Sequence, residues 1–456
     1  MKKIDVKILL LLAALAFGFV ACSDDDDDPE PTPTTSKVVT VQGDLTGAIN
    51  WTADKQYLLS GFVYVTDGAT LTIAPGTIIK GDKASMGTLI VERGGKIIAE
   101  GTQSNPIIFT SNGPQGFRNR GDWGGIVICG KAPVNNGDPQ IEGGPRSHYG
   151  GDVATDNSGI LKYVRIEFAG YPFQPDKEIN GLTMAGVGSG TTIDYVQVSF
   201  SNDDAYEWFG GTVNAKHIIA QSALDDDFDS DNGWNGMVQF ALSMRDRTVA
   251  DVSGSNGFES DNDATGSDNA PQTSPIFSNV SIFGPLAKLT TSNVSGNYKN
   301  SMHLRRNTAL KVYNSLFVGH PNGLLLDGSK AENNAKNGAL QIRNSILSGN
   351  KTFFSVSSSS TTMTSQEVAD WFLTSEFAND TIVNNSSLGL NDPFTLTNPQ
   401  LLPAAGSMLL EGGSFTNENL QNSFFSQVNF RGAFGTENWA SGWTNFDPNN
   451  ADYEAK

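Results

Sequence analysis

The chain has 456 residues, of which 49 are acidic and 30 are basic, and its formal net charge is −19. Such an acidic protein repels DNA and RNA, and no basic patch offsets the charge, so we expect no nucleic-acid partner. It has only two cysteines, Cys22 and Cys129. Disulfides therefore cannot hold the fold together, and a chain of this length must bury a large apolar core.

Residues 1–21 are predicted to be a secretory signal peptide. Three lysines precede the apolar run ILLLLAALAFGFVA, which is too short and wrongly flanked to span a membrane. The stretch FVAC resembles a bacterial lipobox, which implies that Cys22 becomes the lipidated first residue of the mature chain. Residues 22–37 are then an acidic linker rich in Pro and Thr. Its acids could be a solvated spacer.

The start of that linker, Cys22 followed by SDDDDD, also resembles the export signal of Bacteroidetes surface lipoproteins. This resemblance implies a lipid anchor in the outer membrane. It also implies that the protein is exposed on the cell surface.

Residues 38–355 contain short segments that alternate apolar and polar residues and soon reach Gly, Asn or Asp. Alternation predicts half-buried strands, and the glycines predict tight turns. Because the segments recur about every 22–35 residues and each has one apolar face, they predict coils that must stack. The predicted fold is all-β: a right-handed parallel β-helix, a solenoid, with residues 38–60 as an N-terminal cap. Typical segments are ILKYVRIEF (160–168), TIDYVQVSF (192–200) and NAKHIIAQS (214–222).

A β-sandwich or a propeller is the competing all-β fold, but no four-strand blade recurs at an even spacing. Residues 356–456 are predicted to form a C-terminal cap region over the open strand edges of the last coil. This region should contain one short helix, because Thr364 and Glu367 have the spacing of a capping box. Residues Val368, Trp371 and Phe372 then fall on one apolar helical face.

Three stretches resemble a family of Bacteroidetes β-helix surface lipoproteins. They are WTADKQYLLSGFVYVTDGATLTIAPGTIIKG (51–81), GVGSGTTIDYVQVSFSNDDAYEWFGGTVNAKHI (186–218) with LDDDFDSDNGW (224–234), and NFRGAFGTENWASGWTNFDP (429–448). The resemblance covers almost the whole mature chain, and the middle stretch is distinctive. It implies the β-helix fold and the surface location, and it implies no activity.

Carboxylates gather in three repeat copies in the middle of the chain. A shift of 22 residues (228 − 206) aligns segment 206–209 with 228–231, and a shift of 30 (258 − 228) aligns 228–231 with 258–261. Strand alternation then turns the aromatic residue of each copy into the core and its acidic neighbour outward. Stacked coils would place the outward acids in a column, about 4.8 Å apart. The acids of this column are Glu207, Asp229 and Glu259.

Carboxylates this close raise each other's pKa unless a cation lies among them. Calcium is the possible cofactor, because it takes six to eight oxygen ligands in a flexible geometry. An EF-hand is rejected, since Asn232 and Val238 stand where its loop has Gly and Glu. Alternatively, the acids are purely structural, capping turns or bonding between coils. The candidate metal ligands are Asp203, Asp204, Glu207, Asp225, Asp226, Asp227, Asp229, Asp231, Glu259, Asp261 and Asp263.

Two functions fit these observations. The first is a surface-anchored binding or adhesion module that presents an acidic, calcium-loaded face to a glycan or a protein partner. The second is a calcium-dependent polysaccharide lyase or another glycan-degrading enzyme. The fold resembles that of pectate-lyase-type enzymes, in which calcium neutralises a uronate and a nearby Arg or Lys abstracts a proton.

The sequence assigns no catalytic residue, although a base within about 4 Å of the acids in an open groove would favour an enzyme. Arg305 and Arg306 are adjacent, so in a strand they would point to opposite faces and at most one could serve. The candidate bases are His303, Arg305, Arg306, Lys216 and His217.

Overall fold

The structure is a computed structural model that describes residues 37–174, 177–360 and 362–454. The predicted signal peptide, the linker up to residue 36 and the lipidation site Cys22 lie outside the described residues. Within the described ranges, no helix is long and apolar enough to cross a lipid bilayer.

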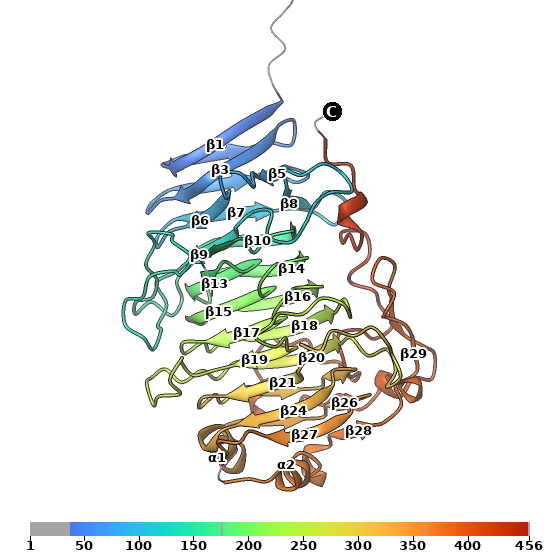
Figure 1. The fold of residues 1–456 in the computed structure, drawn as a ribbon. Helices are drawn as coiled ribbons and strands as arrows, with labels where there is room; N and C mark the ends of the chain where they lie inside the picture. The colour runs from blue at the N-terminus through green and yellow to red at the C-terminus, as the bar shows by residue number, and fades with distance from the viewer. Residues whose placement is uncertain (1–36, 175–176, 361, 455–456) are drawn as a thin grey trace, which may run out of the picture. The chain divides into compact units, whose positions relative to one another are not determined.

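Parallel strands stacked coil upon coil form most of the fold (Figure 1). Each strand pairs in parallel with a strand of the next coil, so the main sheet winds around a continuous apolar core. This confirms the predicted all-β, right-handed parallel β-helix. The first coils contain β1 (Val38–Leu45), β2 (Ala48–Trp51), β3 (Gln56–Val65), β4 (Thr70–Ile73), β5 (Ile78–Gly81), β7 (Lys96–Glu100) and β8 (Ile107–Ser111).

One run of stacked strands, here called the site ladder, carries the acidic segments. In the strands that carry the acids, the aromatic side chains enter the core and the acids beside them face outward. The site ladder consists of β6 (Thr88–Val91), β9 (Gly125–Cys129), β13 (Leu182–Val187), β15 (Tyr206–Gly211), β17 (Phe228–Asp231), β19 (Phe258–Ser260), β21 (Asn300–Arg305), β24 (Asn322–Asp327) and β27 (Thr352–Val356).

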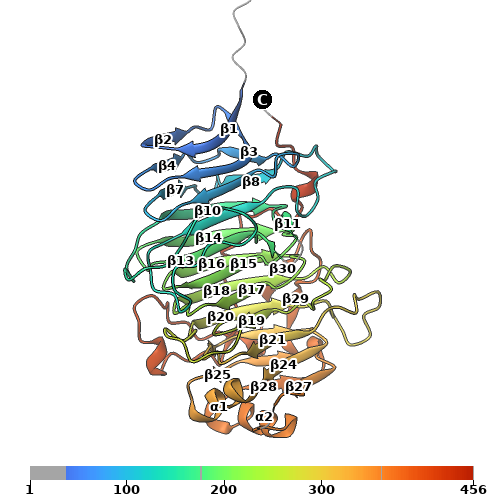
Figure 2. The ribbon, with the colours of Figure 1, turned by 60° about the vertical axis from the view of Figure 1, so that its left-hand side comes forward.

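A second run, here called the bent ladder, covers two faces of the β-helix (Figure 2). Several of its strands turn a corner at one left-handed residue, such as Tyr195 (φ 54°) or His217 (φ 50°). In later coils this residue is Asn314 or Asn344, which tolerate the conformation better. The bent ladder consists of β10 (Gly159–Glu167), β14 (Thr192–Ser199), β16 (Asn214–Gln221), β18 (Met237–Met244), β20 (Ile276–Phe283), β22 (Lys311–Tyr313), β23 (Leu316–Val318), β25 (Gln341–Arg343), β26 (Ile346–Ser348) and β28 (Asp380–Ile382).

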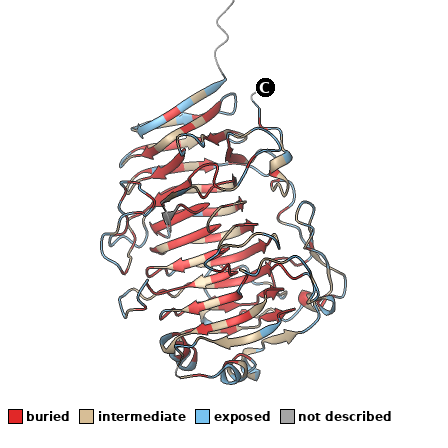
Figure 3. Cartoon of the chain, viewed as in Figure 1, coloured by how far each residue is buried: buried red, intermediate tan, exposed pale blue. Residues whose placement is uncertain are grey.

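Buried residues line the inside of every coil, and exposed ones lie mainly in the connecting loops (Figure 3). Residues 38–60 lie in β1, β2 and the start of β3, and they join the same parallel sheet. The remaining short pairs are β11 (Pro172–Gln174) with β12 (Lys177–Glu178) and β29 (Leu390–Asp392) with β30 (Gln400–Pro403).

The predicted C-terminal helix is present as α2 (Ser365–Phe372) and begins with the predicted capping box between Thr364 and Glu367. A second helix, α1 (Ser329–Asn337), was not predicted, because its sequence SKAENNAKN shows no apolar periodicity. Both helices lie at the last coils (Figure 1). Single 3₁₀ turns occur at Ser375–Phe377, Asn385–Leu388, Met408–Leu410, Glu418–Leu420 and Pro448–Asn450.

Residues 412–454, here called the C-terminal segment, return along the stack from the last coils to the first (Figure 1). Amide side chains of the coils bind its backbone much as a neighbouring strand would. Gln197, Gln239 and Asn314 each donate to one of its carbonyls and accept from one of its N–H groups, at 2.8–3.0 Å. At the far end, Gln56 Nε2 donates to the Tyr453 carbonyl at 2.6 Å. The segment therefore connects coils that are distant in the sequence.

Arg118 tests whether this segment stabilises the first coils. Its buried guanidinium donates to the carbonyls of Pro448 (2.8 Å) and Ala451 (2.9 Å) and lies 4.7 Å from the Tyr453 ring centroid. We expect Arg118→Ala to lower the free energy of unfolding by about 2–3 kcal/mol, because charged hydrogen bonds are lost.

The measurement is urea unfolding combined with hydrogen exchange, which should speed up in residues 445–454. Arg247→Ala is the control, because Arg247 is exposed and should change stability by less than about 0.5 kcal/mol. Unchanged exchange in residues 445–454 of Arg118→Ala would contradict the assignment.

Candidate metal-binding cleft

The outward face of the site ladder carries the acidic column that the sequence predicts. Strand pairing places Glu207 beside Asp229 and Asp229 beside Glu259, on β15, β17 and β19. Their inward neighbours are aromatic and at most 1% exposed, with centroids 5.7 and 5.6 Å apart from coil to coil. The stacked rings fix the strand of each coil, and therefore the position of the acid that follows each ring in the sequence. The rings are those of Tyr206, Phe228 and Phe258.

A ladder of side-chain hydrogen bonds runs beside the column, just before each strand. The Asp226 N–H donates to Asp204 Oδ1 at 2.8 Å, and the Asn256 N–H donates to Asp226 Oδ1 at 2.5 Å. One coil further on, the Asn300 N–H donates to Asn256 Oδ1 at 3.1 Å. One oxygen of Asp204 and one of Asp226 therefore have the structural role that the alternative interpretation gave to the acids.

Five carboxylates of the first acidic coils come together in two overlapping groups. Asp203, Asp204 and Asp225 form one group, and Asp204, Glu207 and Asp229 form the other. In each group the residues offer oxygens that lie within 4.8 Å of one another. Among the described residues, no group donates a hydrogen bond to the buried Oδ1 atoms of Asp225 and Asp229. These clustered acids could hold a metal ion.

The electrostatics of the cluster point to the same conclusion. Burial is the main cause that raises the pKa of Asp204, Glu207 and Asp229, and repulsion from neighbouring carboxylates adds to it. Burial, followed by repulsion from Asp251, raises the pKa of Asp225 to about 7. A cation among these oxygens would remove the repulsion by taking the place of protons.

The other end of the column is closed by basic side chains. His303 on β21 pairs with Glu259, and its Nδ1 and Nε2 lie 3.1 Å from Glu259 and 3.0 Å from Asp327. Burial opposes a charge on His303, but these hydrogen bonds raise its pKa to about 8. Arg305 contacts Glu259 and holds Asp261 at 2.9 Å. Burial alone would raise the pKa of Glu259. The hydrogen bond from His303 and the charge of Arg305 have the larger combined effect, so the pKa is lowered.

Arg305 and Arg306 both reach the acids, because only Arg305 lies in a strand and the prediction of opposite faces holds only for two strand residues. Strand β21 ends at Arg305, and Arg306 is left-handed with φ 46°, so strand alternation no longer applies to it. Arg306 Nη1 lies 2.9 Å from Asp261 Oδ2, while Arg305 Nε lies 2.9 Å from Asp261 Oδ1. Both arginines therefore hold the same carboxylate.

The other two candidate bases lie away from the acids. Lys216 and His217 belong to β16 of the bent ladder. Lys216 donates to the Phe424 carbonyl at 2.8 Å, and His217 Nδ1 lies 2.8 Å from Asp194. Neither of them lines the acidic surface.

Asp227 and Asp263, two of the candidate metal ligands, are already bound by other side chains. Asp227 is completely buried, and its carboxylate lies 2.8 Å from Arg245 Nη1. Asp263 accepts hydrogen bonds from Thr265 and Ser267 in its own turn, and although burial opposes the shift, these bonds lower its pKa to about 2. Asp231 follows Asp229 on the outward face, and burial with repulsion from Asp261 raises its pKa to about 7.

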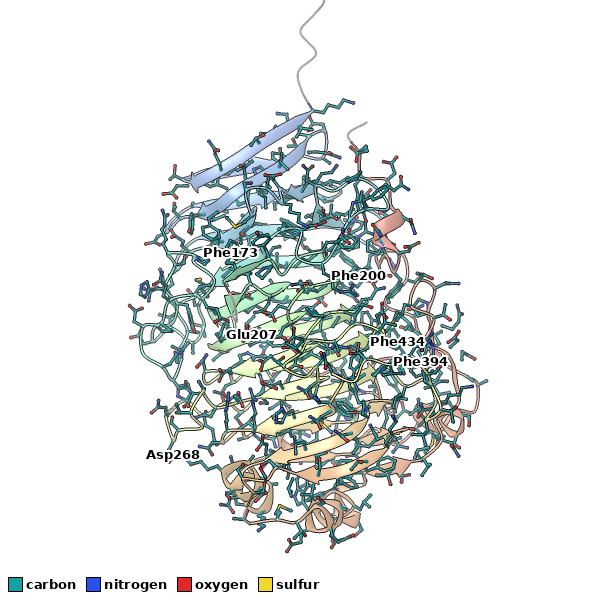
Figure 4. The ribbon with its side chains drawn as sticks, in the orientation of Figure 1. Phe173, Phe200, Glu207, Asp268, Phe394 and Phe434 are labelled. Atoms are coloured by element: carbon teal, nitrogen blue, oxygen red, sulfur yellow. The ribbon has the colours of Figure 1, made fainter. Side chains whose placement is uncertain are left out.

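An open cleft of about 1100 Å³ lies over the cluster. Figure 4 shows Glu207 among the strands that form its floor. Loop residues complete the walls: Glu142 and Asp251 add further acids, and Lys299 adds an exposed cation. These three residues were not predicted from the sequence, because they lie outside the strand repeat that aligned the others.

The chain was then compared with known proteins. Residues 43–391 match the family model described as a pectate-lyase like beta helix domain. The chain belongs to this family. The match includes the whole site ladder and the cleft, and it ends before the C-terminal segment. Searches of the curated proteins and of the solved structures each found no match.

Two neighbouring acids of this β-helix domain should respond differently to neutralisation. Asp227→Asn leaves the buried Arg245 without a counter-charge, so we expect it to lower the free energy of unfolding by about 3 kcal/mol. Asp229→Asn removes one charge from a crowded cluster, so it should not destabilise the metal-free protein.

Thermal unfolding of both variants in EDTA at pH 8 makes the comparison, with the parent protein as reference. Equal losses of stability would mean that Asp229, like Asp227, has a structural role.

Proposed function

We propose that this β-helix domain binds calcium in the acidic cleft and uses the bound ion to hold an acidic glycan. The observation that carries the proposal is the buried Asp229 Oδ1, which lies beside Asp204 and Glu207. It accepts no hydrogen bond from any of the described residues. A buried carboxylate oxygen without a hydrogen bond is unfavourable, and a cation would compensate for it.

The donor atoms favour calcium over other metals. Both groups consist of carboxylate oxygens alone, without His or Cys, which zinc would prefer. Calcium accepts six to eight oxygens in an irregular arrangement, whereas magnesium demands a near-ideal octahedron. The ligands we propose are Asp203, Asp204, Glu207, Asp225 and Asp229.

The exposed cations of the cleft favour an anionic glycan as the partner. Lys299 is exposed and Arg306 is 41% exposed in its side chain, and both line the cleft together with the acidic cluster. A uronate carboxylate could bind the calcium ion on one side and these cations on the other. A neutral ligand would lack the carboxylate that the ion and these cations would bind.

Binding is better supported than elimination chemistry. A lyase needs a free, unprotonated base beside the metal-bound uronate. Both ring nitrogens of His303 are engaged by carboxylates, and Arg305 is held by Glu259 and Asp261. Of the residues offered as bases, His303 and Arg305 are therefore occupied by the acids of the cleft, and Lys216 and His217 lie outside it. Together with the predicted lipid anchor at Cys22, this favours a binding or adhesion module on the outer face of the outer membrane.

The first test is calorimetric titration of calcium into EDTA-stripped protein spanning residues 37–456. Asp204→Asn and Asp229→Asn should each weaken binding by at least about tenfold, because each removes a charged ligand. Asparagine keeps the ladder hydrogen bond at residue 204, since Asn256 accepts the equivalent bond two coils further on.

Asp226→Asn is the matched control. Asp226 lies in the same ladder and lines the same cleft, but it belongs to neither carboxylate group. It should keep more of the calcium affinity than Asp204→Asn. If the parent protein takes up no calcium, the cluster is structural and the proposal fails.

The metal-free protein should lose stability as the pH rises from 5 to 8. The pKa of Asp225 and of Asp231 is about 7, so each keeps its proton in the folded state but loses it near 3.8 when unfolded. Stability present at low pH is therefore lost as the pH rises through 7. Calcium should flatten the profile, because it replaces the proton of its proposed ligand Asp225.

Thermal unfolding across this range, with and without calcium, provides the measurement. His320 acts in the opposite direction, since burial lowers its pKa to about 3, but it contributes equally to both curves. Parallel curves would argue against ion binding by the cluster.

Glycan recognition is tested by titrating oligogalacturonate and oligomannuronate into the calcium-loaded protein. We expect binding that EDTA abolishes and that Lys299→Ala weakens. Ultraviolet absorbance of the same mixtures reports unsaturated products, and their appearance would assign the cleft to a lyase instead.

A further inference from the structure

A second cavity, of about 520 Å³, lies between the bent ladder and the C-terminal segment. None of its lining residues belongs to the acidic cleft. Aromatic residues form one part of its wall, and exposed polar residues of the C-terminal segment form the other. The aromatic residues are Tyr195, His217, Phe240, Phe430 and Trp439, and the polar ones include Gln427, Asn429, Thr436 and Glu437.

The aromatic wall begins as a stack at the corner of the bent ladder. The ring centroid of His217 lies 4.2 Å from that of Tyr195 and 5.1 Å from that of Phe240, with the planes 12° and 17° apart. All three residues are left-handed, which is unfavourable for bulky side chains. Stacking from coil to coil compensates for part of this cost, and all three residues line the cavity.

Trp439 adds a further aromatic ring to this wall. Its indole stacks on Phe434, labelled in Figure 4, at 4.9 Å and 2°, so one face of the ring is covered. Trp439 also lines the cavity, where it meets the His217 ring at 5.2 Å and 58°. Its Nε1 donates to the Ala433 carbonyl at 2.8 Å, which fixes the orientation of the ring.

Polar groups with free bonding capacity face this aromatic surface. The side chains of Gln427, Asn429 and Thr436 are exposed, and none of them has a hydrogen-bond partner among the described residues. His217 Nδ1 is bound to Asp194 at 2.8 Å, and both faces of its ring are covered. The edge that carries Nε2 is therefore the part of His217 that can meet a ligand.

We infer that this cavity is a second carbohydrate site, which binds a neutral pyranose residue of a glycan. A pyranose ring has an apolar C–H face that fits Trp439 and a rim of hydroxyl groups that fits the amides and His217 Nε2. The lining contains Glu437 and no lysine or arginine, so an acidic sugar would be repelled. A peptide strand would need an exposed sheet edge, whereas here side chains form the wall.

The inference does not depend on the calcium-binding cleft. The two cavities share no residue, and the aromatic site contains no group of acids that could hold an ion. One domain would then bind acidic units of a glycan through calcium and neutral units through aromatic rings.

The experiment titrates neutral hexaoses of glucose, mannose and xylose into the protein, with binding followed by calorimetry in the presence of EDTA. We expect at least one hexaose to bind with a Kd of about 1 mM or tighter. His217→Phe keeps a stacking ring but removes Nε2, and Asn429→Ala removes an exposed amide. Each should weaken binding by at least about fivefold, and Trp439→Ala by at least about tenfold.

Trp371→Ala is the matched tryptophan control, because Trp371 lies on α2 and packs edge-on against Phe377 at 5.9 Å, outside the cavity. It should leave the affinity unchanged. Failure of all three hexaoses to bind, or equal binding by His217→Phe, Asn429→Ala and the parent, would overturn the inference. Concentration-dependent dimerisation that Asn429→Ala abolishes would also overturn it, by assigning the cavity to a second copy of the chain. Because EDTA removes calcium, these outcomes do not depend on whether the acidic cleft binds calcium.

Discussion

Parallel hydrogen bonding between successive coils is the constraint on which the rest of the structure depends. It fixes each residue beside the residue at the same position in the next coil, and a slip by one residue would turn every side chain to the opposite face. Identical positions therefore stack, whatever their chemistry. Aromatic rings at one position gain from this repetition, as Tyr206, Phe228 and Phe258 do. Carboxylates at the next position are forced together by the same register.

This constraint also explains how much could be predicted from the sequence. Because the register is periodic, two shifts of the sequence sufficed to pair Glu207, Asp229 and Glu259 correctly and to turn their aromatic neighbours inward. Periodicity ends where a strand ends, so strand alternation could not place Arg306, which lies one residue beyond β21 and turns toward the acids. Loop residues such as Glu142 and Lys299 have no repeat to align.

The C-terminal segment could not be predicted for a related reason. A β-helix needs its end covered, so a cap was expected, and α2 lies there. Single amide side chains, among them Gln197 and Gln239, hold the segment as it returns along the stack. In the sequence these residues look like ordinary polar residues on the outer face of a strand. The segment changes the surface of the face that it covers, because it supplies Trp439 and the polar wall of the aromatic cavity. The two candidate sites thus arise differently: one from repetition within the coils, the other from a segment that lies across them.

The side-chain ladder shows that the fold does not require the acidity of the cleft. Asn256 accepts a backbone hydrogen bond at the same position where Asp204 and Asp226 do, so an amide supports the coil as well as a carboxylate. The carboxylate at residue 204 is buried, and burial followed by repulsion from Asp203 and Asp226 raises its pKa. This arrangement costs stability, and the same ladder contains Asn256 as a neutral alternative. The acid therefore needs a reason other than folding. Binding of a cation is the simplest such reason, because it converts the unfavourable repulsion into the source of affinity.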